Sequence, residues 1–215
     1  MKAGLKARSR QIPPGRLQTR DGGVVVRDIE LVKALRDTGK DFFALADLEK
    51  VTGLDRKSLY VSLNRLLKRR ILERTTRGIY VVPGSGSRLE RIACQLYFPC
   101  YLSFESALSR FGILNMVPYS LSFATTRKTK TIHLLGRQVD YRQIKETLYF
   151  GFDHDDGYYI AKPEKAFLDL VYFSTLGKAS LPLEELDLDA LSRETLRDFA
   201  ERFPPRVNKR LDELL

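Results

Sequence analysis

Apolar residues recur every three or four positions through much of the first eighty residues, which is the spacing of amphipathic helices. The segment "RDIELVKALRDTGK" predicts a helix from an N-cap at Asp28 to a stop at Gly39. We expect three of its apolar side chains to face inward, namely Ile29, Val32 and Leu35. The segment "FFALADLEKVTGL" predicts a second, shorter helix that ends at Gly53 and buries Leu45, Leu48 and Val51.

A third helix follows after a turn of about three residues that contains a glycine. Asp55 is in the N-cap position, and a stripe of leucines predicts the buried face: Leu59, Leu63, Leu66 and Leu67. Two helices joined by such a turn form a helix-turn-helix. The sequence therefore predicts that this third helix is the recognition helix of a nucleic-acid-binding module.

The helical period then changes to alternation of apolar and polar residues. The runs "ILERTT" and "GIYVVP" flank a tip at Thr76, Arg77 and Gly78, and together they predict a two-stranded β-hairpin. Three helices followed by such a hairpin predict a winged helix-turn-helix.

Helical and strand patterns are mixed from residue 88 to the end. We expect helices in "RLERIACQL", in "YLSFESALSRFGIL" with Ser103 as N-cap, in "KPEKAFLDLVYFSTLG" with Pro163 in its first turn, and in "DLDALSRETLRDFAERF". Three segments rich in β-branched and aromatic residues predict strands: "YSLSFATT", "KTIHLLGRQVDYRQI" and "TLYFGFD" through "GYYIA". The predicted fold class is α+β, with an N-terminal winged helix-turn-helix followed by an α+β domain.

The distribution of charge also changes near the boundary between the two predicted modules. Residues 1–83 contain 19 Lys and Arg against 9 Asp and Glu, whereas residues 84–215 contain 18 of each, so the whole net charge of +10 lies in the first part. We expect a flexible basic arm at 1–23, a DNA-binding domain at 24–83, a Gly/Ser linker within "VPGSGSR", and an α+β domain at 88–215. A basic module beside a neutral one indicates a polyanionic partner, and nucleic acid fits better than a membrane.

The outward face of the third helix supplies the candidate DNA contacts. If the leucines face inward, Arg56, Lys57, Tyr60, Asn64 and Lys68 point outward, and Ser58 lies near the N-terminus of the helix. Arg and Lys can bind guanine edges, Asn can pair with adenine, and Ser or Tyr can bind phosphate. Arg74 and Arg77 lie on the predicted wing. The alternative is a solvated cationic face, against which stands the lack of any acidic residue between Arg56 and Leu72.

Composition and motifs narrow the remaining function classes. No apolar run approaches the roughly 20 residues that span a bilayer, and the basic N-terminus lacks the apolar stretch of a secretory signal. Two scattered cysteines and two histidines do not form a zinc motif, so we expect reduced thiols, no metal, no cofactor and a cytoplasmic protein.

Two further segments and one histidine contain residue types that could carry chemistry. The acidic run Asp153 to Asp156 precedes Gly157 and reads better as a hairpin turn than as a metal site, and His133 reads as structural. The segment "TTRKTKT" holds Arg127, Lys128 and Lys130, which form either a solvated loop or a second contact with a polyanion or an acidic partner.

The two modules together resemble the AbiEi-like antitoxins, which are also described as transcriptional regulators, of type IV toxin–antitoxin systems. The likeness rests on "TTRGIYVVPG", "YLSFESALSRFGIL" and "AKPEKAFLDLVYF", in this order and spacing across roughly residues 28–180. The resemblance implies a winged-helix domain joined to an antitoxin domain. It also implies a protein that represses its own operon and counters a cognate nucleotidyltransferase-type toxin without being an enzyme.

We therefore expect a non-enzymatic DNA-binding repressor and antitoxin whose partners are the duplex DNA of its own promoter and, functionally, such a toxin. Two alternatives stay open. One is a metal-dependent nuclease that uses the "DHDD" carboxylates with Lys162 or Lys165. The other is a ligand-sensing repressor, whose second module would enclose an apolar pocket.

Overall fold

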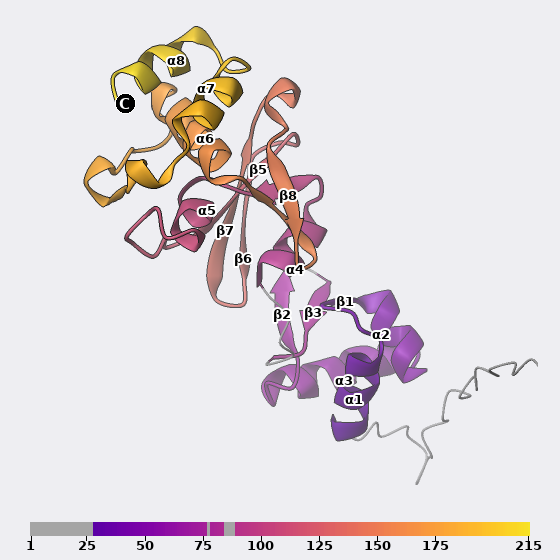
Figure 1. The fold of residues 1–215 in the computed structure, drawn as a ribbon. Helices are drawn as coiled ribbons and strands as arrows, with labels where there is room; N and C mark the ends of the chain where they lie inside the picture. The colour runs from indigo at the N-terminus through magenta and orange to yellow at the C-terminus, as the bar shows by residue number, and fades with distance from the viewer. Residues whose placement is uncertain (1–27, 77, 84–88) are drawn as a thin grey trace, which may run out of the picture.

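The computed structural model describes residues 28–76, 78–83 and 89–215. Figure 1 shows a smaller N-terminal module, built from three helices and a small sheet, below a larger module built on a six-stranded sheet. The predicted arm at 1–23 and most of the predicted linker lie outside the described residues. No helix among the described residues has the length and apolar character needed to cross a membrane.

The N-terminal module has the element order that a winged helix-turn-helix requires. Its elements are α1 (Asp28–Asp37), β1 (Phe43–Ala44), α2 (Leu45–Thr52), α3 (Arg56–Lys68), β2 (Glu73–Thr76) and β3 (Ile79–Val81). The hairpin of β2 and β3 is present, but the prediction of two strands was incomplete. The short strand β1 pairs antiparallel with β3, which gives a three-stranded sheet in the order β1-β3-β2.

The core of this module explains one wrong prediction. Leu31 and Leu35 of α1 pack with Leu48 of α2 and with the leucines of α3, whereas Ile29 is 84% exposed. The Asp28 carboxylate accepts a hydrogen bond at 2.6 Å from Arg69, the residue that directly follows α3, which turns that side of α1 toward α3. The next residue, Ile29, is rotated about 100° further around the helix and points to solvent.

The second module contains most of the elements expected for it. These are α4 (Leu89–Leu96), β4 (Cys100–Leu102), α5 (Phe104–Arg110), β5 (Leu121–Thr125), β6 (Lys130–Leu134), β7 (Arg137–Gln143), β8 (Phe152–Asp155), β9 (Tyr158–Ala161), α6 (Pro163–Thr175), α7 (Arg193–Ala200) and α8 (Pro205–Asp212). One predicted strand and one predicted helix were longer than the observed elements. The segment "TLYFG" begins within the 3-10 turn Glu146–Leu148 and forms no strand, and α7 begins only after a separate 3-10 turn at Leu188–Ala190.

The six strands form one mixed sheet in the order β6-β7-β5-β4-β9-β8. Its register places Leu102, Phe123 and Tyr141 on one face, and the Tyr141 hydroxyl donates to the Ala93 carbonyl of α4 at 2.7 Å. Tyr101 belongs to the opposite face, toward α6. Both faces are therefore covered, which explains why every residue of β4 and β5 is buried.

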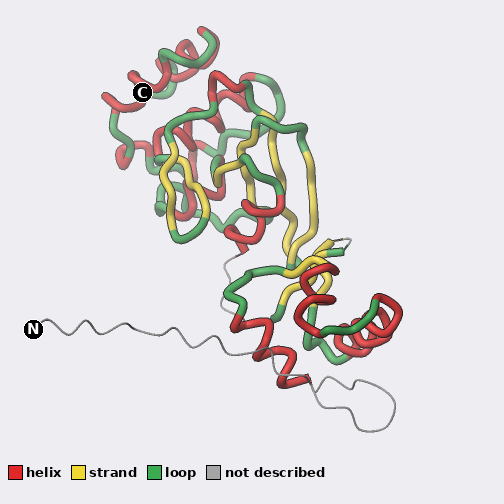
Figure 2. Tube along the Cα trace, turned by 90° about the vertical axis from the view of Figure 1, so that its right-hand side faces the viewer, coloured by secondary structure: helices red, strands yellow, loops and turns green. Residues whose placement is uncertain are grey.

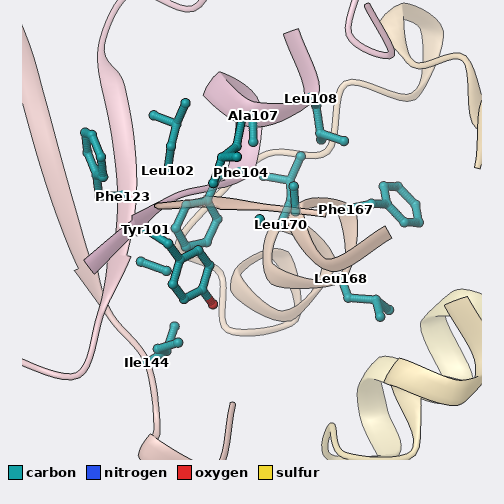
Figure 3. Close-up of a cluster of buried hydrophobic side chains, with 14 of the residues drawn as sticks. Tyr101, Leu102, Phe104, Ala107, Leu108, Phe123, Ile144, Phe167, Leu168 and Leu170 are labelled. Carbon is teal, nitrogen blue, oxygen red and sulfur yellow. The ribbon is translucent and has the colours of Figure 1, made fainter. Parts of the chain in front are cut away.

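Helix α6 lies at the centre of this module. Every residue from Lys165 to Phe173 is buried, because α6 is enclosed by α5, the sheet, α7 and α8. Figure 3 shows Phe167, Leu168 and Leu170 of α6 in the cluster that also holds Tyr101 and Phe104. Cys94 and Cys100 are free and buried.

The two modules touch at the small sheet. Figures 1 and 2 both show the long β6–β7 hairpin reaching β2. Residues of the wing and of the hairpin tip, among them Leu72, Arg74, His133 and Leu135, line a shared open hollow of about 320 Å³. An ion pair at 2.5 Å joins Arg91 of α4 to the buried Asp41, and this aspartate raises the pKa of Arg91. These contacts determine the orientation of the wing relative to the second module.

Candidate nucleic-acid interface

Helix α3 is built so that one face is left for a partner. The Asp55 carboxylate accepts from the Ser58 backbone N–H at 3.0 Å, which fixes the start of the helix, as predicted. Leu59, Leu63 and Leu66 are buried, and Leu67 is half-buried. The leucine stripe thus anchors α3 to the module, and the opposite side of the helix faces solvent.

All six candidate residues of α3 are exposed, namely Arg56, Lys57, Ser58, Tyr60, Asn64 and Lys68. Their surroundings differ. The Ser58 hydroxyl donates to the Asp55 carboxylate at 2.9 Å, and these two bonds from Ser58 hold the pKa of Asp55 below its usual value. Ser58 therefore serves the N-cap, and only the acceptor side of its hydroxyl remains for a partner.

The cations in and next to α3 differ in whether a nearby carboxylate compensates their charge. Asp28 of α1 forms ion pairs with Arg69 at 2.6 Å and with Arg65 at 3.6 Å, and Glu49 of α2 lies 3.8 Å from Arg56. The acids that compensate these arginines come from other helices, so the segment 56–72 itself shows none. Lys57 and Lys68 remain as exposed cations on the outward face.

The wing contributes one further exposed cation, which also lines the hollow shared with the second module. Arg74 is exposed on β2, while Arg77 lies outside the described residues. Gly78 has φ +79°, a left-handed conformation that glycine adopts without strain, so the tight turn at the end of the hairpin is accounted for. Arg74 pairs across the strands with Tyr80, whose side chain belongs to the module core.

The second basic segment forms an ordered loop between β5 and β6. The Arg127 guanidinium donates to the Phe98 carbonyl at 3.2 Å and lies 4.1 Å from the centre of the Tyr97 ring. Lys130 lies 4.9 Å from the same ring, and the Tyr97 hydroxyl donates to the Lys128 carbonyl at 2.9 Å. The three cations are exposed and lie at the end of β6 that is remote from the wing.

The acidic run 153–156 lies in a β-hairpin, although most of it belongs to a strand. Asp153 to Asp155 are part of β8, and the turn itself is Asp156–Gly157, where both φ angles are positive. The Asp155 carboxylate accepts from the Arg110 guanidinium at 3.2 Å and from the Tyr158 hydroxyl at 3.1 Å. Across the described parts of the chain, the structure contains no group of three or more His, Cys, Asp and Glu placed to hold a metal ion.

A buried polar network in the second module was missed by sequence reasoning. Lys165 and Asp169, both on α6, form a fully buried ion pair, and Lys165 also donates to the Tyr101 hydroxyl at 2.8 Å. Tyr101 and Ser103 donate to the other Asp169 oxygen at 2.9 and 2.8 Å, so Ser103 does not cap α5 as predicted. Burial lowers the pKa of Lys165 and raises that of Tyr101. The network is closed and internally satisfied, which is the arrangement of a structural core.

Val61 was also missed. It is 69% exposed on the outward face of α3, between the candidate contacts. Helical periodicity places Val61 on the same outward face as Lys57 and Asn64, but an apolar side chain carries no polar signal that would mark it as a DNA contact.

Comparison with known proteins gives a family match for the N-terminal module. A search of curated proteins found no match to the chain. Residues 30–83 match a family model described as "Transcriptional regulator, AbiEi antitoxin", a segment that runs from α1 through the wing. Over these residues the chain matches the AbiEi antitoxin family of transcriptional regulators, as its sequence led us to expect.

Proposed function

We propose that the protein binds the duplex DNA of its own promoter through α3 and the wing, and that it thereby represses its own operon. One observation carries this proposal: the outward face of α3, with Lys57, Asn64 and Lys68 exposed, lies in a segment matched by a family of transcriptional regulators. A helix with free Lys and Asn side chains suits the major groove, where these groups bind phosphates and base edges.

We further propose that residues 88–215 form a separate domain that provides the antitoxin action against a cognate nucleotidyltransferase-type toxin, without catalysis of its own. The family description supports an antitoxin role, and the resemblance of the two modules to AbiEi-like antitoxins suggests the toxin class. Two hydrophobic clusters, one centred in each module, support the proposed division at 24–83 and 88–215, and Val81 of β3 and Phe42 pack with the cluster of the second module where the modules meet.

Two observations bear on the alternatives. A nuclease would need Lys162 or Lys165 near the "DHDD" carboxylates. Lys165 is buried in the network with Asp169, and Lys162 follows β9 at the end of the hairpin opposite the Asp156–Gly157 turn. A ligand sensor would need an enclosed apolar pocket. The open hollow of about 400 Å³ beside β7 is lined mainly by polar residues, which include Thr131, Asp140, Arg142 and Lys178. Neither observation favours a nuclease or a ligand sensor.

The proposal is tested with a full-length variant in which Arg56, Lys57 and Arg77 are all changed to Ala. Arg56 and Lys57 do not belong to the leucine stripe, so the fold should persist, as circular dichroism would check. In cells that carry a promoter reporter and the cognate toxin, the wild type should repress and protect. The variant should lose repression and keep protection.

Two results would count against the proposal. Repression that survives the triple substitution would remove α3 and the wing from DNA binding. A folded variant that loses protection together with repression would show that toxin neutralisation runs through DNA binding, and the division of labour between the modules would then be wrong.

A further inference from the structure

Val61 occupies the middle of the exposed face of α3. Residues three and four positions apart are neighbours on a helix, so Val61 lies beside Lys57 on one side and Asn64 on the other. Lys68 follows two turns further along the same face. Val61 has 69% of its surface exposed and is an apolar residue with polar neighbours on this face.

Neither packing nor helix propensity accounts for a valine at this position. Its side chain lies outside the hydrophobic cluster of the module. A β-branched residue is also a poorer helix former than the alanine or long polar residues that usually fill exposed helical positions. A single exposed apolar residue is ordinary on a protein surface, but this one lies where the proposed function places the bases.

The major groove presents one apolar feature, the C5-methyl group of thymine, which small apolar side chains contact. We propose that Val61 packs against the methyl group of a thymine and so sets the preferred base pair at one position of the binding site. The inference rests on the proposed function, since it takes α3 to be the helix that enters the groove. In this arrangement Asn64 faces a neighbouring base pair, and Lys57 and Lys68 contact phosphates.

Charge favours DNA over a protein partner as the occupant of this face. A protein surface that covered Val61 would also cover the ammonium groups of Lys57 and Lys68, and burial of unpaired charges is costly. Duplex DNA places phosphates on both sides of the groove and would pair these cations while an apolar group in the groove floor meets Val61.

The test substitutes deoxyuridine for thymine, which removes only the C5-methyl group. After footprinting of the full-length protein on its own promoter, each thymine in the protected site is replaced singly and the dissociation constant is measured. For the wild type, one or two replacements should weaken binding about fourfold, the effect of burying one methyl-sized group. Val61→Ala should weaken binding to the thymine site by a similar factor and should bind the thymine and deoxyuridine sites equally.

Two features allow a lost methyl contact to be distinguished from other effects of the substitution. Alanine has a higher helix propensity than valine, so Val61→Ala should not unfold α3. Ile29→Ala is the matched control, since Ile29 is also a largely exposed β-branched aliphatic residue of the same module, but on α1. This control should retain both the wild-type affinity and the fourfold sensitivity to deoxyuridine.

The inference is overturned if no thymine is sensitive in the wild type, or if Val61→Ala keeps the sensitivity at every position. It is also overturned if Val61→Ala changes the oligomeric state in light scattering and leaves base discrimination intact, which would assign Val61 to a protein contact. In each case the protein still binds its promoter, so the proposed function stands. Failure of the wild type to bind any duplex would instead contradict the proposed function itself.

Discussion

At the scale of single residues, a side chain's neighbours decide its role more than its type does. Lys57 and Arg56 are adjacent cations at the start of α3, but Arg56 lies near Glu49 and its charge is partly compensated. Lys165 is a still stronger case. A helical pattern assigns lysine to solvent, yet Lys165 is fully buried because Asp169 and Tyr101 satisfy its ammonium group. Asp169 is only four residues away on the same helix, but Tyr101 and Ser103, which complete the network, come from a distant part of the chain and leave no mark in the local sequence.

A first prediction follows for this buried pair. Lys165→Met should destabilise the protein by about 3–5 kcal/mol, because it leaves the buried Asp169 carboxylate without its cation. The double variant Lys165→Met with Asp169→Leu should be less destabilised than the sum of the two single changes. Chemical denaturation of all three variants measures this coupling. A Lys165→Met variant as stable as the wild type would show that the pair does not hold the module together.

At the scale of secondary structure, periodicity predicted most helices, because the leucine stripes and caps are local signals. Gly53, Asp55 and Pro163 mark helix ends as expected, and Leu59, Leu63 and Leu66 were assigned to the buried face. The failures have physical causes. Strand β1 has two residues, too few to show a period, and Ser103 is diverted from capping by Asp169. The outward face of α3 could be derived from the sequence, but the ion pairs of Arg65 and Arg69 with Asp28 depend on helix packing.

The start of α2 gives a prediction for pH. Hydrogen bonds from Lys40 and from the Ala44 backbone N–H lower the pKa of Asp47 below 3.8. A lowered folded-state pKa stabilises the protein fully above the unfolded-state pKa, and this contribution is lost as pH falls through the lowered value. Asp47→Ala should therefore cost about 1 kcal/mol at neutral pH, the usual effect of losing such a cap, and less below pH of about 3.8.

Denaturation midpoints between pH 2 and 7 provide the measurement. Asp37→Ala is the control, since Asp37 is an exposed aspartate at the C-terminal end of α1 and should cost little. A loss for Asp47→Ala that stays constant down to pH 2 would contradict the assigned role of its carboxylate.

At the scale of the whole molecule, the charge division and the module boundary coincide. The positive excess lies in residues 1–83, and the described part of this region presents Lys57, Lys68 and Arg74 on one module. The neutral module contacts the wing through the β6–β7 hairpin and holds Asp41 through Arg91. We infer that the second module orients the DNA-binding surface without supplying most of its charge.

The salt dependence of promoter binding by the full-length protein tests the central claim most directly. A plot of log affinity against log salt concentration should fall with a slope of about −0.9 for each phosphate neutralised. Lys57→Ala should make this slope shallower by about 0.9, whereas Lys209→Ala, at an exposed cation of α8, should leave it unchanged. An affinity that does not depend on salt, or a slope that Lys57→Ala leaves unchanged, would contradict the assignment of α3 as the DNA-binding helix.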